Sequence, residues 1–248
     1  MVQESQVDTV GCDLVTKHLR SEPYIQPIFN LFRGGLVVSC QASVGTPMDT
    51  PEFIAAQAMT VEAAGAKAIR AQGVENVALV AKSVKIPVIG LIKSFTSESD
   101  VYITPSVDDV LALEAAGADI VAVDATQRSR LGGISLENFY EKVRMQTNIP
   151  LLADIDSLEN AINAQNLGFD AVATTLNGYT ELPSTGLPNI NLVLNIANSV
   201  AIPLIAEGGF ATPVHVREAI LNGAWAVCVG TAITNPYLLT KYFISEGL

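Results

Sequence analysis

Histidine is scarce in this sequence, and the scarcity argues against two kinds of site. The chain has 248 residues but only two histidines, His18 and His215. A histidine-rich metal centre or a Ser-His-Asp triad is therefore not expected. Asp154 and Asp156 lie close together, but nothing near them in the sequence supplies the remaining ligands of a metal site. We predict no metal, and we interpret His215 as a solvated helix residue.

Basic residues are also few. Fourteen Lys and Arg face 25 Asp and Glu, which gives a net charge of -11 and a pI near 4.5. The bases are scattered, so no patch is available to bind a nucleic-acid backbone. A small anion is still an acceptable ligand, because backbone amides at glycine turns and helix ends can bind it against an unfavourable overall field.

Long apolar runs and paired cysteines are missing too. No run approaches the roughly 18 apolar residues that a membrane span requires, and the segment 1–20 carries Glu4, Asp8 and Asp13 before its first base, unlike a signal peptide. The three cysteines, Cys12, Cys40 and Cys228, are odd in number and widely spaced. They predict reduced thiols, the last two buried in apolar runs. These features indicate a cytoplasmic protein with no membrane partner.

Short apolar runs alternate with helical segments along nearly the whole chain. The runs are continuous rather than alternating, which is typical of parallel strands covered on both faces. The predicted strands are Leu36–Gln41, Ala68–Arg70, Pro87–Lys93, Ile120–Asp124, Leu151–Asp154, Ala171–Thr175, Leu204–Glu207 and Ala226–Val229. The predicted helices between them include Pro51–Ala64, Val107–Ala116, Leu136–Thr147, Leu158–Leu167 and Pro213–Leu221.

Glycines close these predicted helices just before the next strand. They stand at positions 65, 117, 168 and 223, where a left-handed residue ends a helix. A Rossmann-like open sheet would show the same alternation, but the sequence has eight units and no Gly-x-Gly-x-x-Gly turn after any strand. We therefore predict an α/β protein of the (β/α)8 TIM-barrel class. Residues 34–248 form the barrel, and residues 1–33 form an N-terminal helical extension that closes its base or contacts a partner subunit.

Polar residues follow almost every apolar strand. In a (β/α)8 barrel the carboxyl ends of the strands surround the active site. The strand-end residues are Gln41, Arg70, Lys93, Asp124, Asp154, Thr175, Glu207 and the pair Gly230-Thr231. Packing alone does not require so many polar groups at one mouth, so the pattern indicates a binding or catalytic pocket.

Lys93 and Glu207 are the strongest catalytic candidates in this ring. Each ends a buried apolar run, so loss of water disfavours its charged form and brings its pKa toward neutrality. A carboxyl group with a raised pKa can take a proton from carbon. The structural alternatives are a lysine that reaches water and a salt-bridged acid. Gly208-Gly209 and Gly230-Thr231 follow the last two strands, where barrels often bind phosphate through backbone amides.

Eight segments, in order and without large gaps, resemble one known family over about residues 34 to 245. The family is that of the N-acetylmannosamine-6-phosphate 2-epimerases, which act in sialic acid breakdown. The segments are 34–41 (GGLVVSCQ), 68–74 (AIRAQGV), 89–93 (IGLIK), 102–105 (YITP), 123–126 (VDAT), 174–180 (TTLNGYT), 205–208 (IAEG) and 229–234 (VGTAIT).

The resemblance implies an isomerase that inverts C2 of an N-acylhexosamine 6-phosphate without a cofactor. It places Lys93 and Glu207 on the family's catalytic pair. It places five residues on groups that hold the sugar and its acetamido group: Gln41, Arg70, Asp124, Thr175 and Tyr179. It places the phosphate on Gly208, Gly209, Gly230 and Thr231. The expected partners are an amino-sugar phosphate and a second copy of the chain in a homodimer.

Three positions depart from the family pattern. Asn235, Ser94 and Gly209 stand where the family usually has arginine, a basic residue, and a basic or polar residue. Their loss predicts weaker phosphate binding, greater salt sensitivity or acceptance of another substrate.

Two alternatives stay open at this point. One is a phosphorylated-sugar lyase or aldolase that uses Lys93 as a Schiff base, and the other is a non-catalytic sugar-phosphate binder.

Overall fold

Eight parallel strands form a closed barrel in the computed structural model, which describes residues 24–180 and 186–247. The strands pair in sequence order, and β1 pairs with β8 to close the ring. Their bounds are β1 Leu36–Cys40, β2 Ala68–Gln72, β3 Val88–Leu91, β4 Ile120–Asp124, β5 Leu151–Asp154, β6 Ala171–Ala173, β7 Leu204–Ala206 and β8 Ala226–Val229. The predicted (β/α)8 barrel is confirmed.

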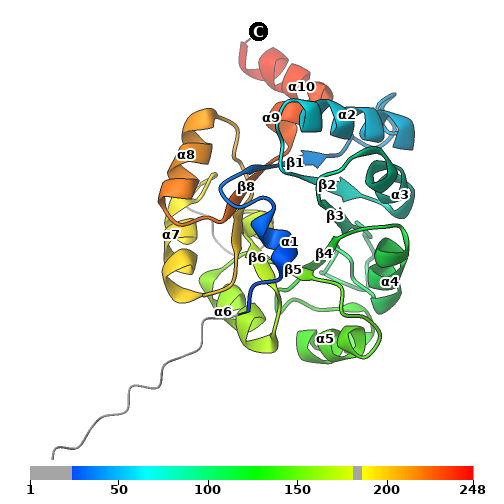
Figure 1. Ribbon diagram of the computed structural model, residues 1–248, viewed down its shortest axis with the longest axis vertical. Helices are drawn as coiled ribbons and strands as arrows, with labels where there is room; N and C mark the ends of the chain where they lie inside the picture. The colour runs from blue at the N-terminus through cyan, green and yellow to red at the C-terminus, as the bar shows by residue number, and fades with distance from the viewer. Residues whose placement is uncertain (1–23, 181–185, 248) are drawn as a thin grey trace, which may run out of the picture.

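Helices cover the outside of the barrel (Figure 1). They are α2 Pro51–Ala63, α3 Val74–Ser83, α4 Val107–Ala115, α5 Leu136–Arg144, α6 Leu158–Leu167, α7 Ile190–Ser199, α8 Pro213–Leu221, α9 Thr231–Thr234 and α10 Pro236–Gly247, with 3-10 turns η1 Leu131–Gly133 and η2 Thr174–Leu176. Within the described ranges, no helix is long and apolar enough to cross a membrane.

Several element ends differ from the prediction by a few residues, and α5 shows the physical reason. It ends at Arg144 rather than Thr147. The Thr147 hydroxyl donates to Glu114 Oε1 at 2.7 Å and accepts from the Ile149 N–H at 3.0 Å. Thr147 therefore ties the connection to α4 instead of extending the helix. Similarly, β6 ends at Ala173 because η2 begins at Thr174.

The glycines that precede strands have the backbone conformation expected from the sequence. Gly65, Gly117, Gly168 and Gly223 have φ values of 105°, 94°, 100° and 95°. This left-handed region is accessible to glycine without the Cβ clash that other residues suffer. The four positions confirm the predicted turns from helix to strand.

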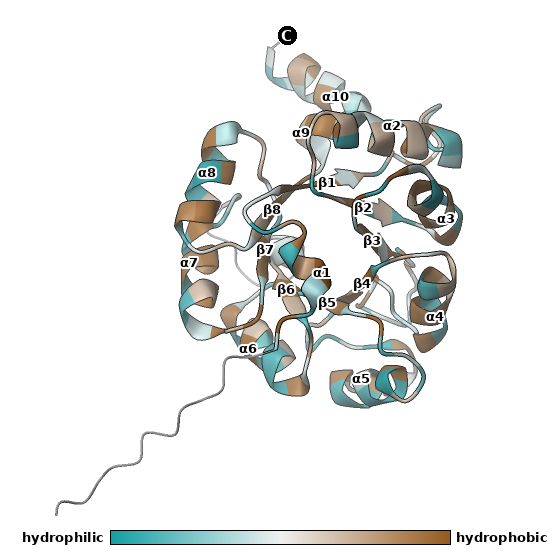
Figure 2. Ribbon diagram, in the orientation of Figure 1, coloured by the Kyte–Doolittle hydropathy of each residue, from teal (hydrophilic) through white to brown (hydrophobic). Residues whose placement is uncertain are grey.

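The apolar core has two parts that follow from the two faces of each strand. Alternate residues point outward and pack under the helices, while the others fill the barrel. The residues that fill it include Val37, Ala68, Ile89, Leu91, Ile120, Ala122, Leu152, Ala171, Ala173, Ile205, Ala226 and Cys228. In Figure 2 the strands are mostly brown, and the surrounding helices carry teal surfaces.

The base of the barrel is closed by the short helix α1 (Pro27–Asn30), which lies across one opening in Figure 1. Phe29 and Phe32 are fully buried and belong to the cluster inside the barrel. The Trp225 indole donates to the Phe29 carbonyl at 2.8 Å, and Arg33 lies 4.4 Å from the centre of the Trp225 rings. Residues 1–23, with Cys12 and His18, lie outside the described residues, and the boundary between residues 33 and 34 stays a prediction.

Candidate active site

The inward-facing series of each strand continues into a ring of polar side chains at the carboxyl ends. Six of these polar residues each follow, by two positions, an apolar residue that belongs to the cluster inside the barrel. Because strand side chains alternate, the polar residues point to the same side, toward the mouth. The six are Arg70, Lys93, Asp124, Asp154, Thr175 and Glu207, and Gln41 follows Val37 by four.

Arg70 joins two acids in the middle of this ring. Its guanidinium donates to both Asp154 oxygens, at 3.0 and 2.5 Å, and its Nη1 lies 3.1 Å from Glu207 Oε2. The side chains of Arg70 and Asp154 are 2% and 0% exposed. A buried charge is tolerated when it is paired in this way. Arg70 from β2 therefore holds groups from β5 and β7 together.

Lys93 lies at the edge of the same cluster and is held from two sides. Its Nζ donates to Gln41 Oε1 at 2.7 Å, and the Gln41 amide donates to Ser39 Oγ at 2.8 Å. Its backbone forms a bridge with Ile103. Thr104, which follows Ile103, has a φ of 44°, a value that is unusual for a β-branched residue. Its hydroxyl donates to the Ala122 carbonyl of β4 at 2.7 Å. These contacts fix the end of β3 against β4.

Burial draws the pKa values of the two candidate catalytic groups toward each other. Loss of water raises the pKa of Glu207, and the nearby Asp154 carboxylate adds to the rise while Arg70 opposes it. Loss of water lowers the pKa of Lys93, with Arg70 acting in the same direction and Glu207 opposing it. The Lys93 and Glu207 charges affect each other, as one shared small site requires. Such convergence is typical of proton-transfer sites.

Two threonines of η2 fix Glu207. The Thr174 hydroxyl donates to the Glu207 carbonyl at 2.7 Å and accepts from the Glu207 N–H at 2.9 Å. Thr175 Oγ1 lies 2.7 Å from Asp154 Oδ1 and 3.0 Å from Glu207 Oε2. A hydroxyl has one proton, so it donates to one carboxylate at a time. The Thr175 hydroxyl therefore links the two acids by bonding to one or the other of them.

Two of the predicted substrate residues lie beside this cluster rather than in it. The fully buried Asp124 carboxylate accepts from Arg128 Nη2 at 2.5 Å and from the Thr126 hydroxyl at 2.7 Å. Tyr179 is 57% exposed and lines a pocket next to the site. The structure thus brings together Gln41, Arg70, Lys93, Thr175 and Glu207.

The predicted phosphate-binding glycines lie in the loops after β7 and β8. Gly208 and Gly209 have φ values of 102° and 74°. A Cβ at Gly209 would lie 2.4 Å from the Leu187 Cβ, so this position has no room for a side chain. Gly230 precedes α9, which Thr231 begins, and a Cβ there would lie 3.4 Å from the Ser39 Cβ. Their role toward phosphate stays a prediction.

Sequence reasoning gave Asp154 no role beyond a strand end, although it is the main partner of Arg70. Its inward position two residues after Leu152 was the available signal.

Cys228 was assigned only as a buried thiol, which is confirmed for it and for Cys40. Burial, the Glu207 carboxylate and its hydrogen bond raise the pKa of Cys228 well above its usual value. Within residues 24–180 and 186–247, no group of three or more His, Cys, Asp or Glu is arranged to hold a metal.

The fold and the ring of side chains define a class of protein, a (β/α)8-barrel enzyme with a partly buried lysine and glutamate suited to proton transfer. The family model described as "NanE: Putative N-acetylmannosamine-6-phosphate epimerase" matches residues 54–246. The chain belongs to this family. A relative with the 2-epimerase name from Caldanaerobacter subterraneus is 43% identical over 220 residues, 88% of this chain and 93% of the relative. Another from Thermosynechococcus vestitus is 42% identical over 214 residues, 86% and 93% of the two chains.

Solved structures agree with this assignment. The N-acetylmannosamine-6-phosphate 2-epimerase from Clostridium perfringens superposes with a TM-score of 0.84 at 34% identity, covering 91% of this chain and 98% of that one. A thiamine phosphate pyrophosphorylase from Pyrococcus furiosus has a TM-score of 0.55 at 18% identity, covering 83% of this chain and 88% of that one. The second likeness concerns the barrel fold alone.

Proposed function

We propose that this protein is a cofactor-independent epimerase that interconverts N-acetylmannosamine 6-phosphate and N-acetylglucosamine 6-phosphate in amino-sugar catabolism. The observation that carries the proposal is the presence of Lys93 and Glu207 in one ring of polar side chains at the barrel mouth, where each charge affects the pKa of the other. They come from the ends of β3 and β7, four strands apart in an eight-stranded ring; Arg70 contacts Glu207 at 3.1 Å, and its charge lowers the pKa of Lys93. Family membership supplies the substrate class.

The reaction needs proton transfer on both faces of one carbon. In the ring-opened sugar, C2 lies next to the C1 carbonyl, which acidifies the C2 proton. Its removal gives an enolate with the charge on the C1 oxygen, and return of a proton to the opposite face inverts C2. Lys93 and Glu207, on opposite sides of the barrel, are placed to flank this carbon. The raised pKa of Glu207 and the lowered pKa of Lys93 bring the two groups closer in proton affinity, which favours proton transfer at both. Which of them removes the proton in each direction stays open, as does assistance by a substrate oxygen.

The surrounding residues have roles that match their contacts. Gln41 and Arg70 position Lys93 and Glu207 and present N–H groups to the sugar. Thr175 bridges Asp154 and Glu207, while Asp124 orients Arg128. Tyr179 lines the adjoining pocket together with Arg128. We assign the 6-phosphate to the amides of Gly208, Gly209, Gly230 and Thr231, in the loops that follow β7 and β8.

Proton NMR in D2O tests the function directly. With N-acetylmannosamine 6-phosphate as substrate, we expect the gluco epimer to appear with deuterium at C2. The label shows that a solvent proton replaced the one lost from carbon. Turnover without deuterium at C2, or failure to convert either epimer, would refute the proposed reaction.

Asn235 offers a test of the phosphate end. Its side chain is an uncharged amide. The Nδ2 lies 3.3 Å from Ser43 Oγ, and the Oδ1 accepts from the Leu238 N–H at 3.0 Å. Asn235→Arg should lower KM for the 6-phosphate sugar about fivefold, with a steeper salt dependence, through one added charge-assisted contact. Steady-state kinetics at several salt concentrations measure the change.

Asn222→Arg is the matched control for this prediction, because it adds the same charge at the end of α8, near the base of the barrel. It should leave KM within about twofold of wild type, since a single screened surface charge acts weakly at a distance. If both variants lower KM equally, the gain is a general charge effect. Equal wild-type affinity for phosphorylated and unphosphorylated sugar would mean that these loops do not bind phosphate.

The exposed face of α10 supports a homodimer. Tyr242, Phe243 and Ile244 are 61%, 72% and 55% exposed, and none of the helix residues described is buried. Exposed large apolar side chains at a chain's surface can mark a contact with a partner. Light scattering should give about twice the 26.2 kDa chain mass for wild type, and Phe243→Glu should shift the protein toward monomer. Ser245→Glu is the control on the same helix, and a monomeric wild type would contradict the prediction.

A further inference from the structure

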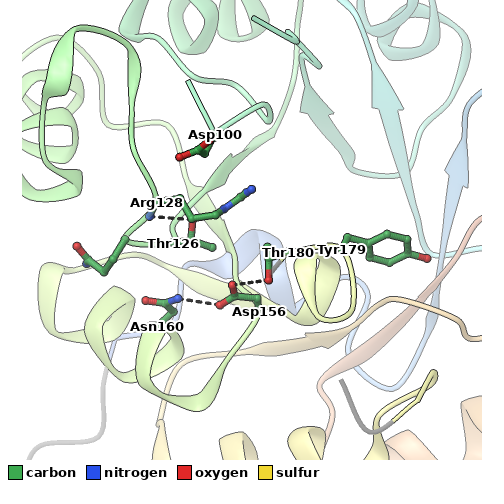
Figure 3. A pocket seen from close by; sticks show the side chains of 8 residues that line it. Asp100, Thr126, Arg128, Asp156, Asn160, Tyr179 and Thr180 are labelled. Carbon is green, nitrogen blue, oxygen red and sulfur yellow. Dashed lines mark hydrogen bonds between the residues drawn. The ribbon is translucent and has the colours of Figure 1, made fainter. Parts of the chain in front are cut away.

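A pocket of about 480 Å³ opens beside the candidate active site. It lies between the loops that follow β4, β5 and β6 and the connection from β3 to α4. It is lined by Asp100, Thr126, Gln127, Arg128, Asp156, Asn160, Tyr179 and Thr180. In Figure 3, Asn160 and Thr180 lie on either side of Asp156, with Arg128 and Asp100 across the pocket.

The pocket adjoins the catalytic ring, because residues that line it contact or directly follow elements of the ring. Arg128, which lines it, pairs with Asp124, and Asp124 is the register partner of Asp154 across β4 and β5. On the other side, Tyr179 follows Thr175 by four residues, and Thr175 contacts Asp154 and Glu207. A group attached to a carbon between Lys93 and Glu207 can therefore extend into the pocket.

Charge argues against phosphate as the occupant of this pocket. Two acids, Asp100 and Asp156, face a single base, Arg128. The loops proposed to hold the phosphate follow β7 and β8, and β8 lies opposite β4 in the closed ring. A substrate anchored there by its 6-phosphate would direct the substituent of C2 toward β4–β6.

We propose that this pocket receives the N-acyl group of the substrate, and that Arg128, Asn160 and Thr180 select acyl groups that carry a hydroxyl. The inference rests on the proposed function and adds to it the acyl specificity. The substrate class is N-hydroxyacyl hexosamine 6-phosphates, such as the N-glycolyl sugar, in addition to the N-acetyl sugar.

Hydrogen-bonding capacity supports this selection. Asp156 accepts from Asn160 Nδ2 at 2.7 Å and from the Thr180 hydroxyl at 2.9 Å, which fixes both side chains. Asn160 Oδ1 and the Thr180 oxygen keep acceptor capacity for an incoming hydroxyl. Arg128 uses Nε and Nη2 on Thr126 and Asp124, while its Nη1 has no partner among the described residues and suits an acyl carbonyl. A purely apolar extension would satisfy none of these groups.

The test compares N-acetyl-, N-glycolyl- and N-propionyl-mannosamine 6-phosphates as substrates. The glycolyl and propionyl groups are similar in size and differ by a hydroxyl in place of a methyl. We expect kcat/KM for the glycolyl sugar to exceed that for the propionyl sugar by about tenfold, the effect of one hydrogen bond. Thr180→Val should reduce this ratio to about threefold or less, whereas Thr180→Ser should preserve it.

Thr60→Val, on the outer helix α2, is the matched control and should keep the wild-type ratio, since its hydroxyl bonds only the Ala56 carbonyl. A wild-type protein that uses the propionyl sugar as well as the glycolyl sugar overturns the acyl assignment, as does a ratio unchanged by Thr180→Val. If Thr180→Val does not fold, the wild-type ratio still decides. Failure to epimerise any of the three sugars refutes the proposed function itself.

Discussion

Glu207→Gln is expected to lower kcat/KM for epimerisation by about 10²–10⁴-fold, and Lys93→Met by a similar factor, the usual contribution of a positioned acid or base. Both substitutions keep the approximate size of the side chain and remove its proton chemistry. The Glu207 backbone stays fixed by Thr174, and Arg70 keeps its two bonds to Asp154. The loss should therefore appear mainly in kcat, with little change in structure.

Matched controls are available on α5, where Glu141 and Lys142 lie on the exposed side. Glu141→Gln and Lys142→Met should keep activity within about twofold, since surface substitutions rarely matter. Epimerisation that survives in both site variants at near wild-type rates would exclude the assigned pair.

The stability that Glu207 contributes to the wild-type protein should depend on pH in a defined direction, and Glu207→Gln should remove that dependence. Folding raises the pKa of Glu207, mainly through burial. The folded state therefore holds this proton more tightly, and its contribution to stability is present below the ordinary glutamate pKa and is lost as pH rises through the raised value. Glu207→Gln should melt at or above the wild-type temperature at neutral pH. A large loss of stability would mean that Glu207 is a structural acid.

Arg70→Met is expected to destabilise the protein by about 3–5 kcal/mol, the usual cost of removing one partner from a buried ion pair. Asp154 and Glu207 would be left as neighbouring buried acids without their shared cation. For a chain of this size, that loss corresponds to a fall of roughly 6–20 °C in the melting temperature. Thermal unfolding followed by circular dichroism measures it.

Arg144→Met is the control for this prediction. Arg144 also pairs with an acid, Asp170, at 2.7 Å, but both side chains are partly exposed, at 22% and 14%. Its loss should be clearly smaller, because water can solvate the acid that remains. Adding Asp154→Leu to Arg70→Met should recover part of the stability, since one buried charge then disappears. Equal losses of stability in Arg70→Met and Arg144→Met would show that the buried ion pair stabilises the fold no more than the partly exposed one.

The barrel could be predicted from the sequence because its signals are local. Continuous apolar strands and glycines such as Gly65 and Gly168 depend on burial and on backbone conformation within a few residues. Element ends were less accurate, since Thr147 and Thr174 make contacts with distant residues that the sequence does not reveal. Of the expected N-terminal helical extension, the described part of the chain contains the four-residue helix α1, and the extension as a whole stays a prediction.

The candidate site could be predicted only in outline. Strand ends identified Lys93 and Glu207, and alternation from Leu91 and Ile205 explains why both point inward. Which polar side chains pair with each other depends on distances across the barrel. Sequence alone therefore could not separate Asp154, bonded to Arg70, from Asp124, which turns to Arg128. The catalytic and binding roles stay predictions until variants are measured.

Exchange of the C2 hydrogen in single variants tests most directly whether Lys93 and Glu207 act on opposite faces of one carbon. Each 6-phosphate epimer is incubated in D2O with Glu207→Gln or with Lys93→Met, and deuterium at C2 is followed by NMR. Each variant keeps one proton-transfer group, so we expect it to label one epimer much faster than the other, without inversion, and we expect the two variants to prefer different epimers. Equal labelling of both epimers by both variants would contradict the account.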